Sequence, residues 1–174
     1  MKILAINGSP RHSKTEAMIK TLIDKVADDS EIIHLSDLSI RPCTGCRKCA
    51  TAPFECQQED GISRLFIKMR LAEIIILASP TYFDNVTGIM KNFFDRCLGL
   101  YWSKKLEGKK VILLTIAGGH RSESAERCLD AMEYWSKLMK MQVIEKIGAF
   151  NGDEHSKDAE LETLSNKLPR MVSQ

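Results

Sequence analysis

The sequence predicts a single α/β domain built on a parallel sheet, and three observations lead to this prediction. Short apolar segments alternate with amphipathic segments of helical length, which is the pattern of strand–helix–strand units. The segments 72–79 and 110–116 are apolar at nearly every position, as expected of strands covered by helices on both faces. The 174 residues suffice for one sizeable core. We therefore expect one domain over 1–174, a doubly wound three-layer αβα fold with five parallel strands in the common order 2-1-3-4-5.

The expected elements alternate regularly along the chain. Strands are expected at 3–6, 31–35, 72–79, 110–116 and 142–147. Helices with an apolar stripe are expected at 14–28, 62–71, 85–100, 122–140 and 155–168. A long connection at about 36–61 contains four cysteines and exceeds the usual length of a loop without structure of its own. This connection therefore needs something that orders it.

Composition favours small-molecule chemistry. The 25 basic and 23 acidic residues leave a net charge of +2, which gives no electrostatic signal for nucleic acid or for an anionic membrane. No apolar segment approaches the roughly 20 residues that span a bilayer, and the chain begins without a signal-peptide pattern. We therefore expect a cytoplasmic protein whose six cysteines are thiols or metal ligands rather than disulfides.

The turn after the first strand predicts an anion site. Asn-Gly-Ser-Pro at 7–10 leads into the first helix, whose first N–H groups have no partners within the helix. Ser9, Ser13 and Thr15 can add hydroxyl donors, and Arg11 adds a positive charge. The turn matches neither the P-loop nor the G-x-G-x-x-G pattern, which favours a single phosphate monoester as the ligand. An ordinary strand–turn–helix connection is the alternative.

Two further loops are expected at the same edge of the sheet. The segment 79–85 contains Tyr82 and Phe83 and several free amides, which suit one edge of a planar heteroaromatic ring. The fourth strand ends in Ala117-Gly118-Gly119-His120, where paired glycines let a ligand approach the backbone closely. Together with a phosphate site, these loops predict a site for flavin mononucleotide (FMN). For Tyr82 and Phe83, the alternative is packing in the core.

At these positions the chain resembles a known family. Gly8-Ser9-Pro10-Arg11, Pro80-Thr81-Tyr82-Phe83 and Ala117-Gly118-Gly119 are similar in order and spacing to the flavodoxin-like NADPH-dependent FMN reductases and iron-sulfur flavoproteins. The similarity extends to Gly88, Lys91, Phe94, Asp95 and Arg96. The resemblance implies a flavodoxin-like fold, bound FMN, NAD(P)H or another donor such as reduced ferredoxin, and a homodimer or homotetramer. It implies that the cofactor-binding residues are Ser9, Arg11, Ser13, Thr15, Pro80, Thr81, Tyr82, Phe83, Asn85, Ala117, Gly118 and Gly119.

No side chain is assigned as a general acid or base, because a bound flavin carries the redox chemistry and the protein supplies position and electrostatics. Asp84 and His120 are candidates for tuning the flavin only. Two functions remain open at this point. The first is an oxidoreductase that passes electrons from NAD(P)H through FMN to a small-molecule or protein acceptor. The second is a non-enzymatic electron carrier between protein partners such as ferredoxins.

Four cysteines form a compact array in the long connection. The spacing C-x2-C-x2-C-x6-C is made by Cys43, Cys46, Cys49 and Cys56. Three close thiolates and a fourth that folds back can complete the shell of a [4Fe–4S] cluster, and the array resembles the compact motif of the iron-sulfur flavoproteins. A zinc ion in the same shell and metal-free thiols are the alternatives. We expect Cys97 and Cys128 to be buried within helices.

Apolar residues near the third and fourth helices suggest self-association. They are Leu98, Leu100, Tyr101, Trp102, Met132, Tyr134, Trp135, Leu138 and Met139. Such stripes usually include core positions, so the pattern alone does not distinguish a core from an interface.

Overall fold

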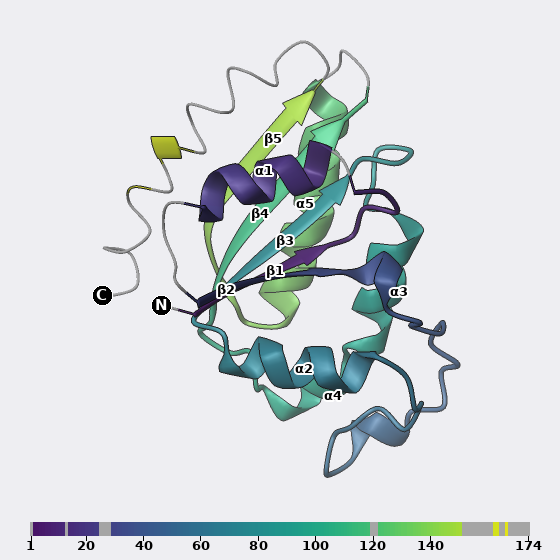
Figure 1. Ribbon diagram of the computed structural model, residues 1–174. Coiled ribbons are helices and arrows are strands. Elements are labelled where there is room, and N and C mark those ends of the chain that lie inside the picture. The colour runs from purple at the N-terminus through teal and green to yellow at the C-terminus, as the bar shows by residue number, and fades with distance from the viewer. Residues whose placement is uncertain are drawn as a thin grey trace.

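The computed structural model describes residues 2–12, 14–24, 29–118 and 122–150, together with 162, 163 and 166. In this part of the chain a five-stranded parallel sheet has the order β2-β1-β3-β4-β5 (Figure 1). The strands are β1 (Lys2–Asn7), β2 (Asp29–His34), β3 (Ile74–Pro80), β4 (Lys110–Ala117) and β5 (Gln142–Phe150). The predicted fold class and strand order are confirmed, whereas the single domain over the whole of 1–174 stays a prediction.

Helices cover both faces of the sheet. On one face, α1 (Lys14–Ile23) packs against β1, β3 and β4. The other face carries α2 (Ile62–Leu71), α3 (Gly88–Arg96), α4 (Leu98–Ser103) and α5 (Ser122–Leu138). Successive strand residues point to opposite faces, so Ile3 and Ala5 join the core under α1 while Leu4 and Ile6 join the core on the other side. No described helix is long and apolar enough to cross a membrane.

The register brings three loops to one edge of the sheet. Asn7, the last residue of β1, lies beside Ala78 of β3, and Pro80, the last residue of β3, lies beside Ile116 of β4. Because parallel strands end at the same edge, the segments that follow β1, β3 and β4 leave the sheet side by side (Figure 1). This edge is where the sequence places its candidate site.

The predicted helix over 85–100 begins later than expected. Asn85 pairs with Tyr82 in a tight turn, and α3 starts only at Gly88. The reason is a local cap: the hydroxyl of Thr87 accepts a hydrogen bond from the backbone N–H of Met90 at 3.1 Å. The expected helical start at Asn85 is therefore wrong.

The same predicted helix is also divided. The backbone turns at Cys97, with φ −82° and ψ 6°, and α4 follows as a separate short helix. This turn directs α4 toward the cysteine-rich connection, where Gly99 lies very close to the carbonyl group of Phe54. Other ends differ by a few residues: α1 ends at Ile23, α5 ends at Leu138, and β5 continues to Phe150. The predicted last helix, 155–168, lies almost entirely outside the described residues.

The long connection contains two short 3-10 helices, η1 (Leu35–Asp37) and η2 (Lys48–Ala50), and is otherwise irregular. Its cysteine-bearing part extends away from the sheet beside α4, on which η2 packs (Figure 1). We call residues 41–60 the cysteine loop.

Candidate functional site

A cavity of about 250 Å³ opens at the carboxyl ends of β1, β3 and β4. Its lining comes from the three loops that the sequence singles out, namely Ser9, Arg11, Lys14, Thr15, Pro80, Thr81, Tyr82, Ile116, Ala117 and Gly118. The structure thus brings most of the predicted cofactor-binding residues together. Phe83 and Asn85 do not line this cavity, and Ser13 and Gly119 lie outside the described residues. That these residues bind FMN stays a prediction.

The loop after β1 is shaped by its own side chains. The Oδ1 atom of Asn7 accepts a hydrogen bond from the backbone N–H of Ser9 at 2.9 Å. The Oγ atom of Ser9 donates to the carbonyl of Arg11 at 2.7 Å and accepts from the N–H of Arg11 at 3.2 Å. The hydroxyl proton of buried Ser9 is therefore used within the loop. Ser9 organises the loop, while the start of α1 and the cationic side chains of Arg11 and Lys14 provide positive potential at the cavity.

Thr87 joins this loop to α3. Its hydroxyl donates to the carbonyl of Gly8 at 2.6 Å, while the N–H of Gly8 donates to the carbonyl of Ala78 at 2.7 Å. A Cβ atom added at Gly8 would lie 2.8 Å from the terminal methyl of Met90, so the close approach requires glycine. The sequence analysis did not identify Thr87. A threonine directly before the first residue of a helix, and three residues before buried Met90, is a recognisable cap.

The loop after β3 ends in a two-residue turn between Tyr82 and Asn85. Their backbones exchange hydrogen bonds of 2.8 and 3.1 Å. Phe83 (φ 48°) and Asp84 (φ 57°) both have left-handed backbones, which is the pattern of a type I′ turn. Phe83 is fully exposed at the tip and Tyr82 is 43% exposed, so the core-packing alternative for both aromatics is wrong. A phenylalanine in this backbone region is uncommon, and such residues concentrate at functional sites.

Asp84 fastens the tip of this turn to α5. Its carboxylate accepts a hydrogen bond from the Ser124 hydroxyl at 2.6 Å and forms an ion pair with Arg127 at 2.9 Å. These two partners lie in the first turns of the helix that follows the third loop. Asp84 thus holds two walls of the site together. His120, the other candidate for tuning a flavin, lies outside the described residues.

The cysteine loop brings its four thiols toward one region. Cys43 and Cys46 are exposed, whereas Cys49 and Cys56 are half-buried, and all are free thiols. The pKa of the Cys49 thiol is raised, first by burial and then by the neighbouring sulfurs of Cys56, Cys46 and Cys43. The four thiols are therefore near one another within the cysteine loop. Their role as metal ligands stays a prediction.

Backbone N–H groups point at two of these sulfurs. The N–H of Gly45 donates to the Sγ atom of Cys43 at 3.5 Å. A hydrogen bond from the backbone of Lys48 is the largest cause of a lowered pKa at Cys46, followed by one from the Thr44 hydroxyl. Donors of this kind stabilise thiolates and tune the potentials of iron–sulfur clusters.

Comparison with known proteins identifies the family. The sequence profile of the NADPH-dependent FMN reductase family matches residues 1–155. The chain belongs to this family. The resemblance noted in the sequence is therefore confirmed.

Two relatives of this FMN reductase family member carry the name iron-sulfur flavoprotein. The protein from Archaeoglobus fulgidus is 37% identical over 129 residues, which cover 72% of this chain and 63% of that protein. The protein from Methanosarcina thermophila is 28% identical over 156 residues, covering 87% of this chain and 81% of that one. The solved structure of a flavone reductase shares the fold with a TM-score of 0.75 at 17% identity, covering 100% of this chain and 64% of that one.

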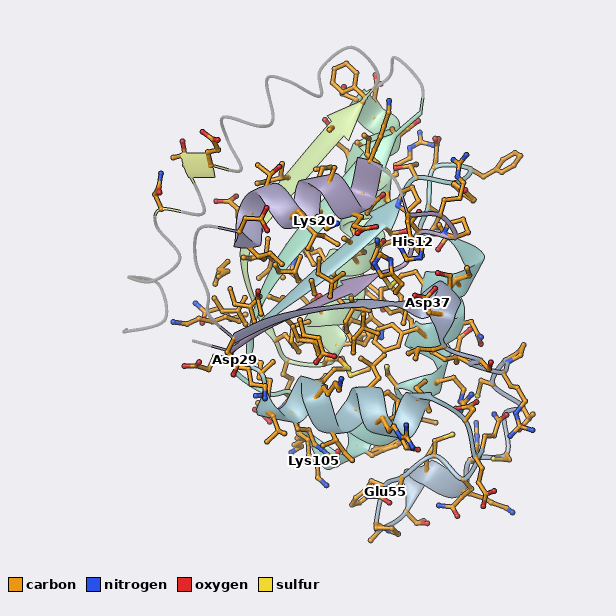
Figure 2. All side chains as sticks on the ribbon, viewed as in Figure 1. His12, Lys20, Asp29, Asp37, Glu55 and Lys105 are labelled. Atoms are coloured by element: carbon orange, nitrogen blue, oxygen red, sulfur yellow. The ribbon has the colours of Figure 1, made fainter. Side chains whose placement is uncertain are left out.

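A cluster of His12, Glu16 and His34 lies beside the loop after β1, and the sequence analysis did not predict it. The ring centroids of His12 and His34 are 4.0 Å apart. The Oε2 atom of Glu16 lies 3.2 Å from the Nδ1 atom of His12 and 3.7 Å from the Nε2 atom of His34. His12, labelled in Figure 2, is also 3.5 Å from a carboxylate oxygen of Asp37.

This histidine cluster stabilises the loop rather than offering a cation site. Asn7 uses its Oδ1 atom for Ser9, so its Nδ2 atom faces the Nδ1 atom of His34 at 3.1 Å and donates to it. Neutral His34 therefore carries its proton on Nε2, toward Glu16, and that nitrogen has no lone pair for a metal ion. The second oxygen of Glu16 pairs with Lys20 at 2.7 Å, and this bond is the largest cause of a lowered pKa at Glu16.

Proposed function

We propose that the chain is an FMN-dependent oxidoreductase that receives electrons from NADPH or NADH at the edge of the sheet. The observation that carries this proposal is the convergence of three loops on one cavity. The start of α1 and Arg11 line one part of this cavity, and the loops that follow β3 and β4 line the rest. Family membership supports FMN as the cofactor and a nicotinamide as the donor. FMN, when bound, accepts two electrons as a hydride and passes electrons onward.

The residues present fit FMN. The start of α1, Arg11, Thr15 and the segment around Ser13 would hold the phosphate, because helix N-terminal N–H groups and a guanidinium both favour an anion. The backbones of 80–82 and 117–118, and of the adjacent Gly119, would border the isoalloxazine ring. Phe83 and Asn85 lie in the turn that follows these backbones and do not line the cavity. No side-chain acid or base is needed for this role.

Titration of flavin-free protein with FMN tests this proposal. We expect one FMN per chain, with quenched flavin fluorescence and a raised melting temperature, since a ligand that binds only the folded state stabilises it. Riboflavin, which lacks the phosphate, should bind more weakly because it cannot use the start of α1 and Arg11. Protein that binds neither compound, or both equally, would contradict the proposed use of the loop after β1.

We further propose that Cys43, Cys46, Cys49 and Cys56 hold a [4Fe–4S] cluster. The support is the spacing of four cysteines within one loop, the influence of the other three sulfurs on the pKa of Cys49, and the N–H group of Gly45 that donates to Cys43. The printed names of the two relatives point in the same direction. A cluster, when bound, supplies single-electron transfer beside a cofactor that accepts electrons in pairs.

Anaerobic reconstitution with iron and sulfide tests the cluster. We expect about four irons and four sulfides per chain and an electron paramagnetic resonance signal after reduction. A Cys46→Ser variant should lose this signal, whereas Cys128→Ser, a matched change at a buried cysteine outside the loop, should keep it. Reconstituted wild-type protein that binds FMN but no stoichiometric iron would refute the cluster and leave the loop cysteines as thiols.

We also propose that the chain forms a homodimer through an apolar groove of about 530 Å³ between α3, α4 and α5. Tyr134 and Leu138 are 67% and 44% exposed there, and the buried indole N–H of Trp135 has no hydrogen-bond partner in the described part of the chain. Sedimentation should give a dimer at micromolar concentration, and Leu138→Glu should give a monomer. A wild-type monomer at that concentration would contradict the proposal.

A further inference from the structure

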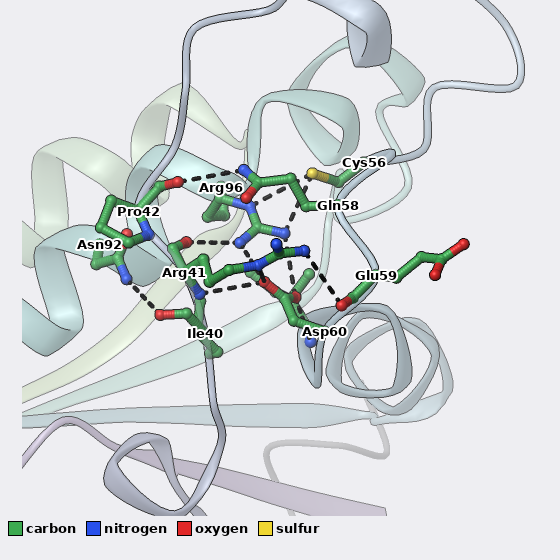
Figure 3. Close-up of polar contacts among 10 residues, drawn as sticks. Ile40, Arg41, Pro42, Cys56, Gln58, Glu59, Asp60, Asn92 and Arg96 are labelled. Carbon is green, nitrogen blue, oxygen red and sulfur yellow. Dashed lines mark hydrogen bonds and ion pairs between the residues drawn. The ribbon is translucent and has the colours of Figure 1, made fainter.

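The guanidinium group of Arg96 is buried beneath the cysteine loop (Figure 3). Arg96 lies in the last turn of α3, and its side chain is 0% exposed. Asp60, from the end of the cysteine loop, is 4% exposed and forms an ion pair with it at 2.6 Å. A buried arginine is unfavourable unless its charge is paired and its N–H groups are satisfied. The partners of this group therefore indicate what it does.

Each N–H group of Arg96 can be assigned to a partner. The Nη1 atom donates to an Asp60 carboxylate oxygen and to the carbonyl of Arg41, both at 2.6 Å. The Nη2 atom donates to the other Asp60 oxygen at 3.1 Å. The Nη2 and Nε atoms both donate to the Sγ atom of Cys56 at 3.3 Å. These five contacts equal the five donors of a guanidinium, so the group is fully used.

The contacts clamp the two ends of the cysteine loop. One partner, Arg41, precedes the first cysteine, and the other two, Cys56 and Asp60, lie at the loop's far end (Figure 3). The amide of Asn92, one turn earlier on α3, adds a hydrogen bond to the carbonyl of Ile40 at 3.0 Å. Helix α3 thus supplies the ordering that a connection of this length needs.

Cys56 differs from the other three cysteines in this respect. The first three follow one another at x2 spacing, while six residues separate Cys49 from Cys56, which cannot be placed by the same local turns. Two N–H groups of a cationic fork bond its sulfur, and a sulfur that carries negative charge accepts such bonds far better than a neutral thiol. The site is therefore built for a charged or metal-bound sulfur at Cys56.

We propose that Arg96 is a positioning residue for the cluster: it holds Cys56 in place as the fourth ligand and withdraws electron density from its sulfur. This inference rests on the proposed [4Fe–4S] cluster. Hydrogen bonds to cluster sulfurs stabilise the reduced state, and partners that orient a ligand typically change metal affinity by about 10- to 100-fold. Loss of the fork should therefore loosen the cluster and make its reduction potential more negative.

The test compares Arg96→Lys with Arg47→Lys in the full-length, FMN-loaded and anaerobically reconstituted protein. Lysine at position 96 keeps the charge for Asp60 but loses the planar fork that reaches Cys56. Arg47 makes the matched control, because it lies within the cysteine array on the exposed surface. A double variant, Arg96→Gln with Asp60→Asn, removes the fork without leaving a buried charge unpaired. Circular dichroism and FMN affinity establish that each variant folds.

The readouts are the rate of iron loss to a chelator and the midpoint potential of the cluster, followed by electron paramagnetic resonance. We expect both Arg96 variants to lose iron on the order of 10- to 100-fold faster than wild type, with a more negative potential and an altered signal, while Arg47→Lys behaves as wild type. Wild-type protein that holds iron, together with Arg96 variants that match it in retention, potential and signal, would overturn this inference alone. Wild-type protein that takes up no iron would overturn the proposed cluster and this inference with it.

Discussion

Polar side chains around the loop after β1 differ in whether they form hydrogen bonds or ion pairs within the protein. The hydroxyl of Ser9 is bonded within its own loop, and Glu16 is paired with Lys20 and faces two histidines. Arg11 is exposed and lines the cavity at the start of α1. We therefore assign anion binding to Arg11 and loop geometry to Ser9.

Replacing Arg11 with alanine should weaken FMN binding by about tenfold or more, because a charge-assisted hydrogen bond contributes roughly 1.5–3 kcal/mol. Fluorescence titration measures the change, and riboflavin affinity should stay the same because riboflavin carries no phosphate. Arg64→Ala, at an exposed arginine of α2, is the control. Equal loss of affinity for FMN and riboflavin would show that Arg11 does not act on the phosphate.

The six cysteines should fall into two reactivity classes in iron-free protein. Burial raises the pKa of Cys97 well above the usual thiol value and also raises that of Cys128. Raised values keep both as neutral, unreactive thiols at pH 8, and burial blocks reagent access. Mass spectrometry after brief iodoacetamide treatment should find label on exposed Cys43 and Cys46 and none on buried Cys128 of α5 or on Cys97, which is buried as expected but lies in the turn between α3 and α4. Early labelling of Cys97 or Cys128 in folded protein would contradict their assigned burial.

Helices α3 and α4 connect the candidate flavin site to the cysteine loop. At the N-terminus of α3, Thr87 donates a hydrogen bond to the loop after β1. At the C-terminus of α3, Arg96 donates hydrogen bonds to the cysteine loop. Helix α4 continues this contact through Gly99. The two candidate sites are therefore attached to opposite ends of one helix.

Gly99→Ala should disturb the cysteine loop while sparing FMN binding. A Cβ atom at position 99 would lie 2.2 Å from the carbonyl oxygen of Phe54 and 3.4 Å from the Cβ atom of Cys49, so the loop backbone must move. We expect reduced iron content after reconstitution with FMN affinity within about twofold of wild type. Gly88→Ala, at a helical glycine with open space around it, is the matched control. Normal iron content in Gly99→Ala would contradict the close packing of α4 on the loop.

Glu133 of α5 links this helix to β5 by an ion pair with Lys146 at 2.6 Å, and it also pairs with Lys137 of the same helix at 2.7 Å. Hydrogen bonds from these lysines, Lys137 first, lower the pKa of Glu133. A carboxyl group with a lowered folded-state pKa adds stability at neutral pH that disappears as the pH falls through that value. Glu133→Gln should therefore lower the free energy of unfolding by about 0.5–1 kcal/mol at pH 7 in low salt. Urea titrations should show this difference shrink and vanish as the pH falls through the lowered pKa of Glu133; a difference that persists in acid, below that pKa, would exclude the ionic explanation.

For the whole molecule, periodicity and strand ends were enough to predict the sheet and the cavity. The apolar runs around Ile75 and Leu113 identified the central strands, and the loops that follow them carried the site residues. The Arg96 clamp and the place of His34 in the histidine cluster could not be predicted, because both depend on contacts between residues far apart in sequence. Cys56 and Arg96 are 40 residues apart, and no local pattern links them.

We propose above that this fold receives electrons from a nicotinamide at a bound flavin. The most direct measurement is anaerobic reduction of the FMN-loaded protein, followed by flavin absorbance, with NADPH, NADH and reduced ferredoxin as separate donors. We expect NADPH or NADH to bleach one flavin per chain, and the Arg11→Ala variant to require a higher FMN concentration for the same amplitude. Bleaching by reduced ferredoxin alone would contradict the claim and identify the chain as a carrier between protein partners.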